Sequence, residues 1–315
     1  MVYETFLNNI QSLVQARFGS SADVSVRRVL KNNGLLLDGL TISSPLSKTA
    51  PTIYLNSYYE EAEEGMSLSA ITDQIMLLCE ENPALPDRLE ESLHCFSCVR
   101  ERIAYRLINA RENQWLLSDV PYYPYLDLAI VFYLIVSEND DGQMTALIHQ
   151  EHLDLWGVTK EELWTLAEQN TLRLLPGRIT PIETALAELD MLDPANPSGH
   201  QPALPLYVLT NQKGINGASC ILYPGILKDF AEQLQDDLFI LPSSIHEVLL
   251  TPCSRSLPPD ELNAMVSCIN RTDVPIEDRL SDHVYCFSRV QSCLFLPSVS
   301  PQAPASAPDG TGNPQ

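Results

Sequence analysis

The chain has 315 residues, which exceeds the usual size of a single domain and favours two. Hydrophobic residues make up 45% of the chain, enough to bury a substantial core, so global disorder is excluded. The 41 acidic and 19 basic residues give a formal net charge of −22. Phosphate backbones and anionic membranes attract basic surfaces, so we expect no nucleic acid and no membrane as a partner.

The N-terminal stretch MVYETFLNNIQSLVQARFGSS has neither a basic n-region nor an unbroken apolar core, so it predicts no signal peptide. The longest apolar run, LAIVFYLIV at 128–136, is too short to cross a bilayer as a helix but suits a buried strand. We therefore expect a cytoplasmic protein, in which the 8 cysteines stay reduced.

Residues 1–100 are predicted to form an N-terminal α+β domain. Apolar residues at helical spacing predict an amphipathic helix at 3–18. Extended runs on both sides of the turn residues Asn32–Gly34 predict a hairpin, and a third strand follows at 51–56. After an acidic loop, the pattern predicts a helix at 67–81, for which Ser67 is a suitable N-cap.

Residues 101–297 are predicted to form a larger, C-terminal α+β domain. Strands are expected at 102–110, 127–136 and 144–150, and a helix at 159–170. Thr159 and Glu162 form a capping box at the start of that helix. A similar order recurs at 206–235, as strand, turn, strand and helix. The sequence thus predicts two domains with antiparallel sheets and repeated β-turn-β-α units.

The remaining segments complete this prediction. A loop is expected at 176–205, because it is rich in Pro, Gly and Asn. A strand at 237–242, a helix at 259–270 and a last strand at 283–289 follow. Residues 298–315 are rich in Pro, Ala, Ser and Gly and cannot bury enough apolar surface to offset chain entropy, so we predict a disordered tail.

The string PSSIHE at 242–247 raises a choice between structure and catalysis. Ser244 lies three residues before Glu247, which is the spacing of a capping box and predicts the start of a helix after Pro242. Free N–H groups at such a helix start could also hold an anion. In both cases the hydroxyl groups of Ser243 and Ser244 serve the main chain.

The catalytic alternative is a serine hydrolase. It would use Ser243 or Ser244 as nucleophile, His246 or His283 as base and an acid such as Asp282. A purely local version is disfavoured, because residues two apart on a helix point in different directions. No Gly-x-Ser-x-Gly elbow surrounds either serine.

Other motifs give weaker signals for cofactors. Cys95 and Cys98 form a Cys-x-x-Cys, but the other cysteines supply no second pair for a zinc site, and no βαβ pattern precedes them as in redox proteins. Gly214 and Gly217 lie between predicted strands, so a turn explains them better than a phosphate-binding loop. We predict no metal and no cofactor.

One further hypothesis concerns a possible surface site made of Asn211, Ser243, Glu247 and Asp282. Asn211 and Ser243 lie at the ends of predicted strands, and Asp282 lies just before another one. These polar side chains would converge if those strand ends share one edge of a sheet.

Several strings together resemble a known family: VLTN, GASCILYPGIL, ILPSSIHEVLL, DRLSDHVY and YLNSYYEEAEEGMSLSAI. The family consists of uncharacterised proteins from clostridial-type anaerobic bacteria and is catalogued only as a domain of unknown function. The resemblance covers nearly all of residues 1–295. It implies a bacterial, cytosolic protein and brings no assigned activity, cofactor or catalytic residue.

The functional prediction follows from what the motifs lack. No motif has the residue types and spacing that catalysis demands. We therefore expect a non-catalytic module that binds a protein partner or acts as a regulator. The serine hydrolase is the alternative.

Overall fold

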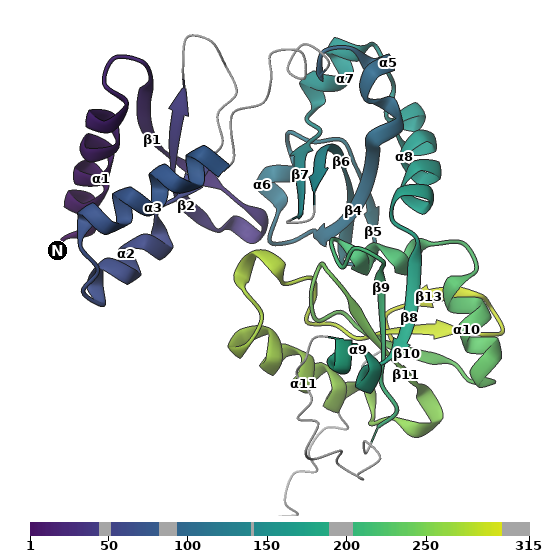
Figure 1. The fold of residues 1–315 in the computed structure, drawn as a ribbon. Coiled ribbons are helices and arrows are strands. Elements are labelled where there is room, and N and C mark those ends of the chain that lie inside the picture. Colours follow the sequence, from purple (N-terminus) through teal and green to yellow (C-terminus); the bar gives the residue numbers. More distant parts are fainter. Residues whose placement is uncertain (44–51, 82–92, 140–141, 189–203, 298–315) are drawn as a thin grey trace, which may run out of the picture.

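The computed structural model describes residues 1–43, 52–81, 93–139, 142–188 and 204–297 (Figure 1). The predicted tail at 298–315 lies outside the described residues. Within them, the chain forms three sheets whose strand pairs are all antiparallel, surrounded by helices. The predicted α+β class with antiparallel sheets is confirmed.

The N-terminal region is a three-stranded sheet packed against helices. Its elements are α1 (Tyr3–Phe18), β1 (Asp23–Leu30), η1 (Asn32–Gly34), β2 (Leu36–Ser43), β3 (Thr52–Tyr54), α2 (Asn56–Glu63) and α3 (Leu68–Glu81). Phe6, Ile10 and Val14 recur every fourth residue, so one face of α1 is buried against the sheet and α3. Ser67 caps α3 as predicted, because its Oγ accepts the N–H of Ala70. The acidic loop predicted between the third strand and the helix at 67–81 is wrong in part, since most of that stretch is α2 (Asn56–Glu63).

The middle region is a four-stranded sheet in which β6 pairs with β4, β5 and β7. Its elements are α5 (Phe96–Val99), η2 (Arg100–Arg102), β4 (Ile103–Asn109), α6 (Gln114–Leu117), β5 (Tyr122–Tyr125), β6 (Leu128–Asn139), β7 (Gly142–Leu147), α7 (Gln150–Trp156) and α8 (Lys160–Leu174). The predicted capping box is present, because Thr159 and Glu162 exchange hydrogen bonds at the start of α8.

The C-terminal region is a six-stranded sheet in the order β13-β12-β10-β11-β9-β8. Its elements are β8 (Gly177–Pro181), α9 (Ile182–Glu188), β9 (Tyr207–Asn211), η3 (Gly217–Leu222), α10 (Ile226–Leu234), β10 (Leu238–Leu241), β11 (Val248–Pro252), η4 (Cys253–Arg255), α11 (Pro259–Thr272), η5 (Ile276–Asp278), β12 (Tyr285–Ser288) and β13 (Cys293–Phe295). Two predictions are wrong here: 176–205 is not all loop, since it contains β8 and α9, and β13 follows the strand predicted to be last.

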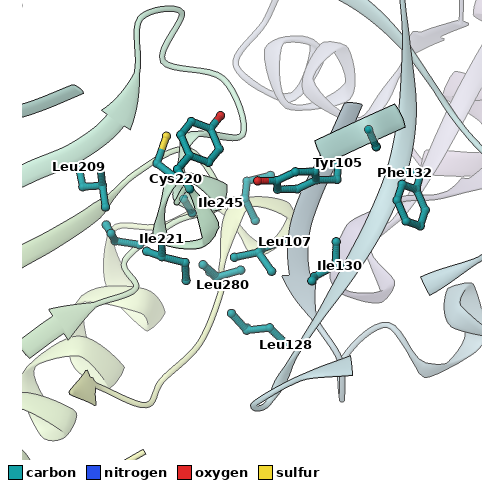
Figure 2. Close-up of a cluster of buried hydrophobic side chains, with 14 of the residues drawn as sticks. Tyr105, Leu107, Leu128, Ile130, Phe132, Leu209, Cys220, Ile221, Ile245 and Leu280 are labelled. Atoms are coloured by element: carbon teal, nitrogen blue, oxygen red, sulfur yellow. The ribbon is translucent and has the colours of Figure 1, made fainter. Parts of the chain in front are cut away.

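The middle and C-terminal regions share one hydrophobic core (Figure 2). Tyr105 and Leu107 of β4 meet Ile245 and Leu280, which precede β11 and β12. The N-terminal region has its own core, built on α1, its sheet and α3. The described residues of this core end at Cys79, and those of the shared core begin at Leu93.

The predicted second strand of the repeat, at 218–223, is wrong, because this segment is the 3-10 helix η3. Apolar runs of this length fit a strand or a buried helix equally well by pattern. Here packing decides: Ser219 Oγ accepts the N–H of Leu107 on β4 (3.1 Å). A Cβ at Gly217 would come within 2.4 Å of the His246 carbonyl, so only glycine fits the tight entry to η3. The second β-turn-β-α unit therefore does not form.

Candidate functional site

The string PSSIHE forms the loop between β10 and β11, so the predicted helix start after Pro242 is wrong. β10 and β11 pair antiparallel, with Leu241 opposite Leu249, so the chain must reverse between them. Ser244 Oγ accepts the N–H of His246 (2.9 Å) and donates to Glu247 Oε1 (2.9 Å). The residues of a capping box thus close a turn, because a serine hydroxyl can bind the amide two residues on.

His246 is held on both sides of its ring. Nδ1 accepts the backbone N–H of Asn216 (3.3 Å), and Nε2 lies 3.3 Å from Asp278 Oδ1. The hydrogen bond to Asp278 raises the pKa of His246, and partial burial opposes that rise. The amide of Asn216 also works against protonation, since it needs Nδ1 as an acceptor. The ring contacts no serine hydroxyl among the described residues.

A second turn of the same design lies just before β12. Ser281 Oγ accepts the N–H of His283 (2.9 Å) and donates to Asp127 Oδ2 (2.6 Å). The Nδ1 atom of His283 lies 3.0 Å from the same carboxylate oxygen. We call the segments 244–246 and 281–283 the two Ser-His turns. Sequence reasoning missed this repeat, although the pattern Ser-x-His directly before a strand occurs in both places.

Asp127, at the start of β6, organises the second turn. Its Oδ2 atom receives Ser281 and His283, and its Oδ1 atom accepts the hydroxyl of Tyr285 (2.7 Å). Tyr285 is fully buried, and burial raises its pKa well above 10.0, with a further rise from the charge of Asp127. Ser281, His283 and Tyr285 thus surround the Asp127 carboxylate. That carboxylate is half-buried, and the imidazole of His283 beside it is exposed.

A cleft of about 370 Å³ opens beside this second turn. Its walls come from all three regions: the tip of the N-terminal hairpin, the segments after β4 and before β6, and the end of α11 with the chain up to β12. The lining residues are Asn33, Asn109, Arg111, Glu112, Asp127, Asn270, Arg271, Ile276, Arg279, Leu280, Ser281, Asp282 and His283. We call it the junction cleft.

The hairpin tip is docked at the junction cleft by side-chain amides. Asn33 donates from Nδ2 to the carbonyls of Ile276 and Arg279 (both 2.7 Å). Asn33 and Asn113 also bind each other twice, through backbone N–H to Oδ1 and Nδ2 to Oδ1 (both 2.8 Å). Figure 1 shows the purple hairpin reaching the yellow-green segment before β12. The turn residues were predicted, but their docking role was not.

Two more asparagines fix the segment that carries the second Ser-His turn. Asn109, at the end of β4, donates to the carbonyl of Leu280 (2.9 Å). Asn270, at the end of α11, donates to the carbonyl of Ser281 and to Asp282 Oδ1 (both 2.9 Å). Asn270 is 2% exposed, and its own Oδ1 is buried with no hydrogen-bond partner in the described part of the chain.

The hypothesis of a surface site required that the strand ends carrying its residues share one edge of a sheet. These residues do lie at one end of the six-stranded sheet. The ends of β9 and β10 and the starts of β11 and β12 share that end. The side chains nevertheless separate. Asn211 is 0% exposed and closes the turn at 211–215, so it lies below the surface. Ser243 and Glu247 stay in the β10–β11 loop, whereas the exposed Asp282 lines the junction cleft.

The predicted catalytic residues are divided in the same way. Ser243, Ser244 and His246 belong to the first loop, and Asp282 and His283 belong to the junction cleft. Ser243 donates its backbone N–H to the carbonyl of Leu241 (3.1 Å). Within the described residues, no hydroxyl of Ser243 or Ser244 is hydrogen-bonded to an imidazole.

The Cys-x-x-Cys lies at the start of α5, with both thiols exposed. A hydrogen bond with Ser97, followed by one with Cys98, lowers the pKa of Cys95 to about 7. Among the described residues, no group of three or more His, Cys, Asp or Glu side chains is arranged to hold a metal ion. No helix in the same part of the chain has the length and apolar character of a membrane span.

Comparisons with known proteins place the chain in a family without an assigned activity. No curated protein and no solved structure is significantly similar to it. The model of one family, described as a family of unknown function (DUF5688), matches residues 3–289. That match spans all three sheets up to β12 and both Ser-His turns. The chain therefore belongs to the family of unknown function DUF5688.

Proposed function

We propose that this protein is a non-catalytic binding module with a regulatory role, and that the junction cleft is its binding site. The observation that carries the proposal is the pairing in both Ser-His turns: each imidazole lies against a carboxylate, and each serine hydroxyl donates to a carboxylate. The serines therefore serve turns and not an attack on a substrate.

Nucleophilic catalysis by serine needs an imidazole within hydrogen-bond reach of the hydroxyl. Ser244 is 7% exposed, and its hydroxyl is engaged by Glu247 and by the amide of His246. The His246 ring is engaged by Asp278 and by the amide of Asn216. A hydrolase built on this loop would have to break several of these contacts before it could act.

The regulatory part of the proposal follows from the walls of the junction cleft. Asn33 belongs to the docked hairpin tip, while Arg279 and its neighbours belong to the segment that receives the tip. An occupant of the cleft would touch both sides of this docking contact. Binding and docking would then stabilise each other, because a ligand shifts a conformational equilibrium by its differential affinity for the two states. A protein partner could sense the docked arrangement.

A fluorophosphonate probe, which labels activated serines, tests the non-catalytic claim. We expect no mass increase on the wild-type protein and no difference in Ser244→Ala or Ser243→Ala. The exposed Ser69 provides a matched control as Ser69→Ala. Labelling that is lost in either Ser243→Ala or Ser244→Ala, and is kept in Ser69→Ala, would establish the hydrolase alternative and end this proposal.

A further inference from the structure

Three arginines line the junction cleft without an ion pair. Arg271 and Arg279 each use Nε to bind a main-chain carbonyl, of Ser267 and Val274 respectively (both 3.0 Å). These bonds fix the two guanidinium groups and leave other N–H groups for a ligand. No carboxylate forms a salt bridge with them or with Arg111 within the described residues. A guanidinium fork suits a carboxylate or phosphate, so one end of the cleft's ligand is anionic.

The same cleft also offers carboxylate oxygens to a ligand. Asp282 Oδ1 accepts a hydrogen bond from Asn270 Nδ2 (2.9 Å), and the exposed carboxylate keeps its other oxygen for a ligand. The carboxylates of Asp282 and Glu112 also line the cleft, and neither forms an ion pair among the described residues. Asp127 is different, because Ser281, His283 and Tyr285 already surround it. The carboxylates of Asp282 and Glu112 call for N–H donors on the ligand.

We propose that the junction cleft binds a small zwitterion of the α-amino acid class. Its carboxylate lies among the three arginines, and its ammonium group faces the exposed carboxylates of Asp282 and Glu112. The cleft volume of about 370 Å³ lies at the lower end of the range for small-molecule sites, which suits such a ligand. The three arginines are matched by three carboxylates in the lining, those of Glu112, Asp127 and Asp282, so amino acids with uncharged side chains bind better than acidic or basic ones. This inference rests on the proposed binding role of the cleft.

The binding test uses the full-length protein and the standard amino acids, each examined by thermal shift and then by isothermal titration calorimetry. We expect at least one amino acid to bind saturably, and amino acids with uncharged side chains to bind better than acidic or basic ones. Its analogues that lack either the amino group or the carboxylate should bind about tenfold more weakly or worse, because each loses charge-assisted hydrogen bonds. Binding by none of the amino acids, or equal binding by either analogue, would overturn the assignment.

Variants locate the site. Arg111→Gln and Arg271→Gln change exposed side chains and should each weaken binding about tenfold. Arg255→Gln is the matched control, since Arg255 is an exposed arginine of η4 outside the cleft. Its affinity should equal that of the wild type. Unchanged affinity in the two cleft variants, or an equal loss in Arg255→Gln, would place the ligand elsewhere.

The fate of the bound amino acid separates this inference from the proposed function. We follow it by proton NMR over several hours of incubation. Binding without consumption of the amino acid supports both the ligand assignment and the non-catalytic function. Binding with consumption supports the ligand class and ends the non-catalytic proposal. Absence of binding ends the ligand class alone, because the covalent-probe result on Ser243 and Ser244 stands independently of it.

Discussion

The two Ser-His turns share a local design but differ in their surroundings. In both, a serine closes the turn on the amide of a histidine two residues on and donates to a carboxylate. The ring of His246 is held at both nitrogens, and its side chain is 34% exposed. Among the described residues, the ring of His283 is held at Nδ1 alone, and its side chain is 63% exposed beside the junction cleft. One local motif thus builds a closed loop in one place and borders an open cleft in another.

The largest expected difference between the turns concerns their carboxylates. Asp127→Ala removes the acceptor of three groups, including the buried hydroxyl of Tyr285, and should destabilise the protein by about 3 kcal/mol. Asp278→Ala removes the side-chain contact to His246 and should cost about 1 kcal/mol. Chemical denaturation measures both. Equal losses would mean that the second turn has no stronger support than the first.

Removing the serine hydroxyl should also destabilise the protein more in the second turn than in the first. Ser281→Ala takes a hydroxyl from the crowded Asp127 site and should lower the free energy of unfolding by about 2 kcal/mol. Ser244→Ala frees the half-exposed Glu247 to reach water and should lower it by about 1 kcal/mol. A larger loss for Ser244→Ala in the same denaturation experiment would reverse the ranking of the two turns.

Docking of the hairpin tip should affect only the second turn. Asn33 has a φ of 57°, so Asn33→Gly keeps the left-handed backbone and removes the side-chain bonds to Ile276 and Arg279. We expect hydrogen exchange at 276–283 to become about tenfold faster, and exchange at 242–247 to stay unchanged.

Asn216→Gly is the control for that experiment, because Asn216 has a φ of 54° and lies beside His246 instead. It should leave exchange at 276–283 as in the wild type. Unchanged exchange at 276–283 in Asn33→Gly would show that the tip does not support the cleft.

The smallest expected effect is the pH dependence from His246. Its pKa is raised in the folded protein above the ordinary 6.5, chiefly by the hydrogen bond to Asp278. A raised folded-state pKa contributes stability that is fully present below the unfolded pKa and is lost as the pH rises through the folded pKa. The stability difference between wild type and His246→Gln should therefore shrink as the pH rises past 6.5. A difference that grows over this range would contradict the assigned contact.

The sequence patterns correctly predicted those elements that are determined by residues close together in the chain. The apolar face of α1, the hairpin around Asn32–Gly34 and the capping box of α8 all follow from neighbouring residues. The segment at 218–223 did not, because its conformation depends on Ser219 binding β4, more than a hundred residues earlier. Short apolar runs carry no information about such contacts.

The candidate site shows the same limit. Asp127 looks unremarkable in the sequence, since its partners Ser281, His283 and Tyr285 lie about 150 residues away. His283 was predicted only as a base of the hydrolase alternative, and Asp282 both as its acid and as a member of the possible surface site. The repeated Ser-x-His pattern was the one readable signal for the shared turn. The docking of Asn33 needed the tertiary structure, because a turn sequence does not name what it contacts.

The central claim is that the Ser244 hydroxyl belongs to a turn and not to a nucleophile–base pair. A pair of double-mutant cycles on the free energy of unfolding tests it most directly. We predict a coupling of about 1 kcal/mol between Ser244→Ala and Glu247→Ala, which removes the acceptor oxygen, and a coupling near zero between Ser244→Ala and His246→Gln, which keeps the bonded amide. Coupling of Ser244 to His246 with none to Glu247 would contradict the account.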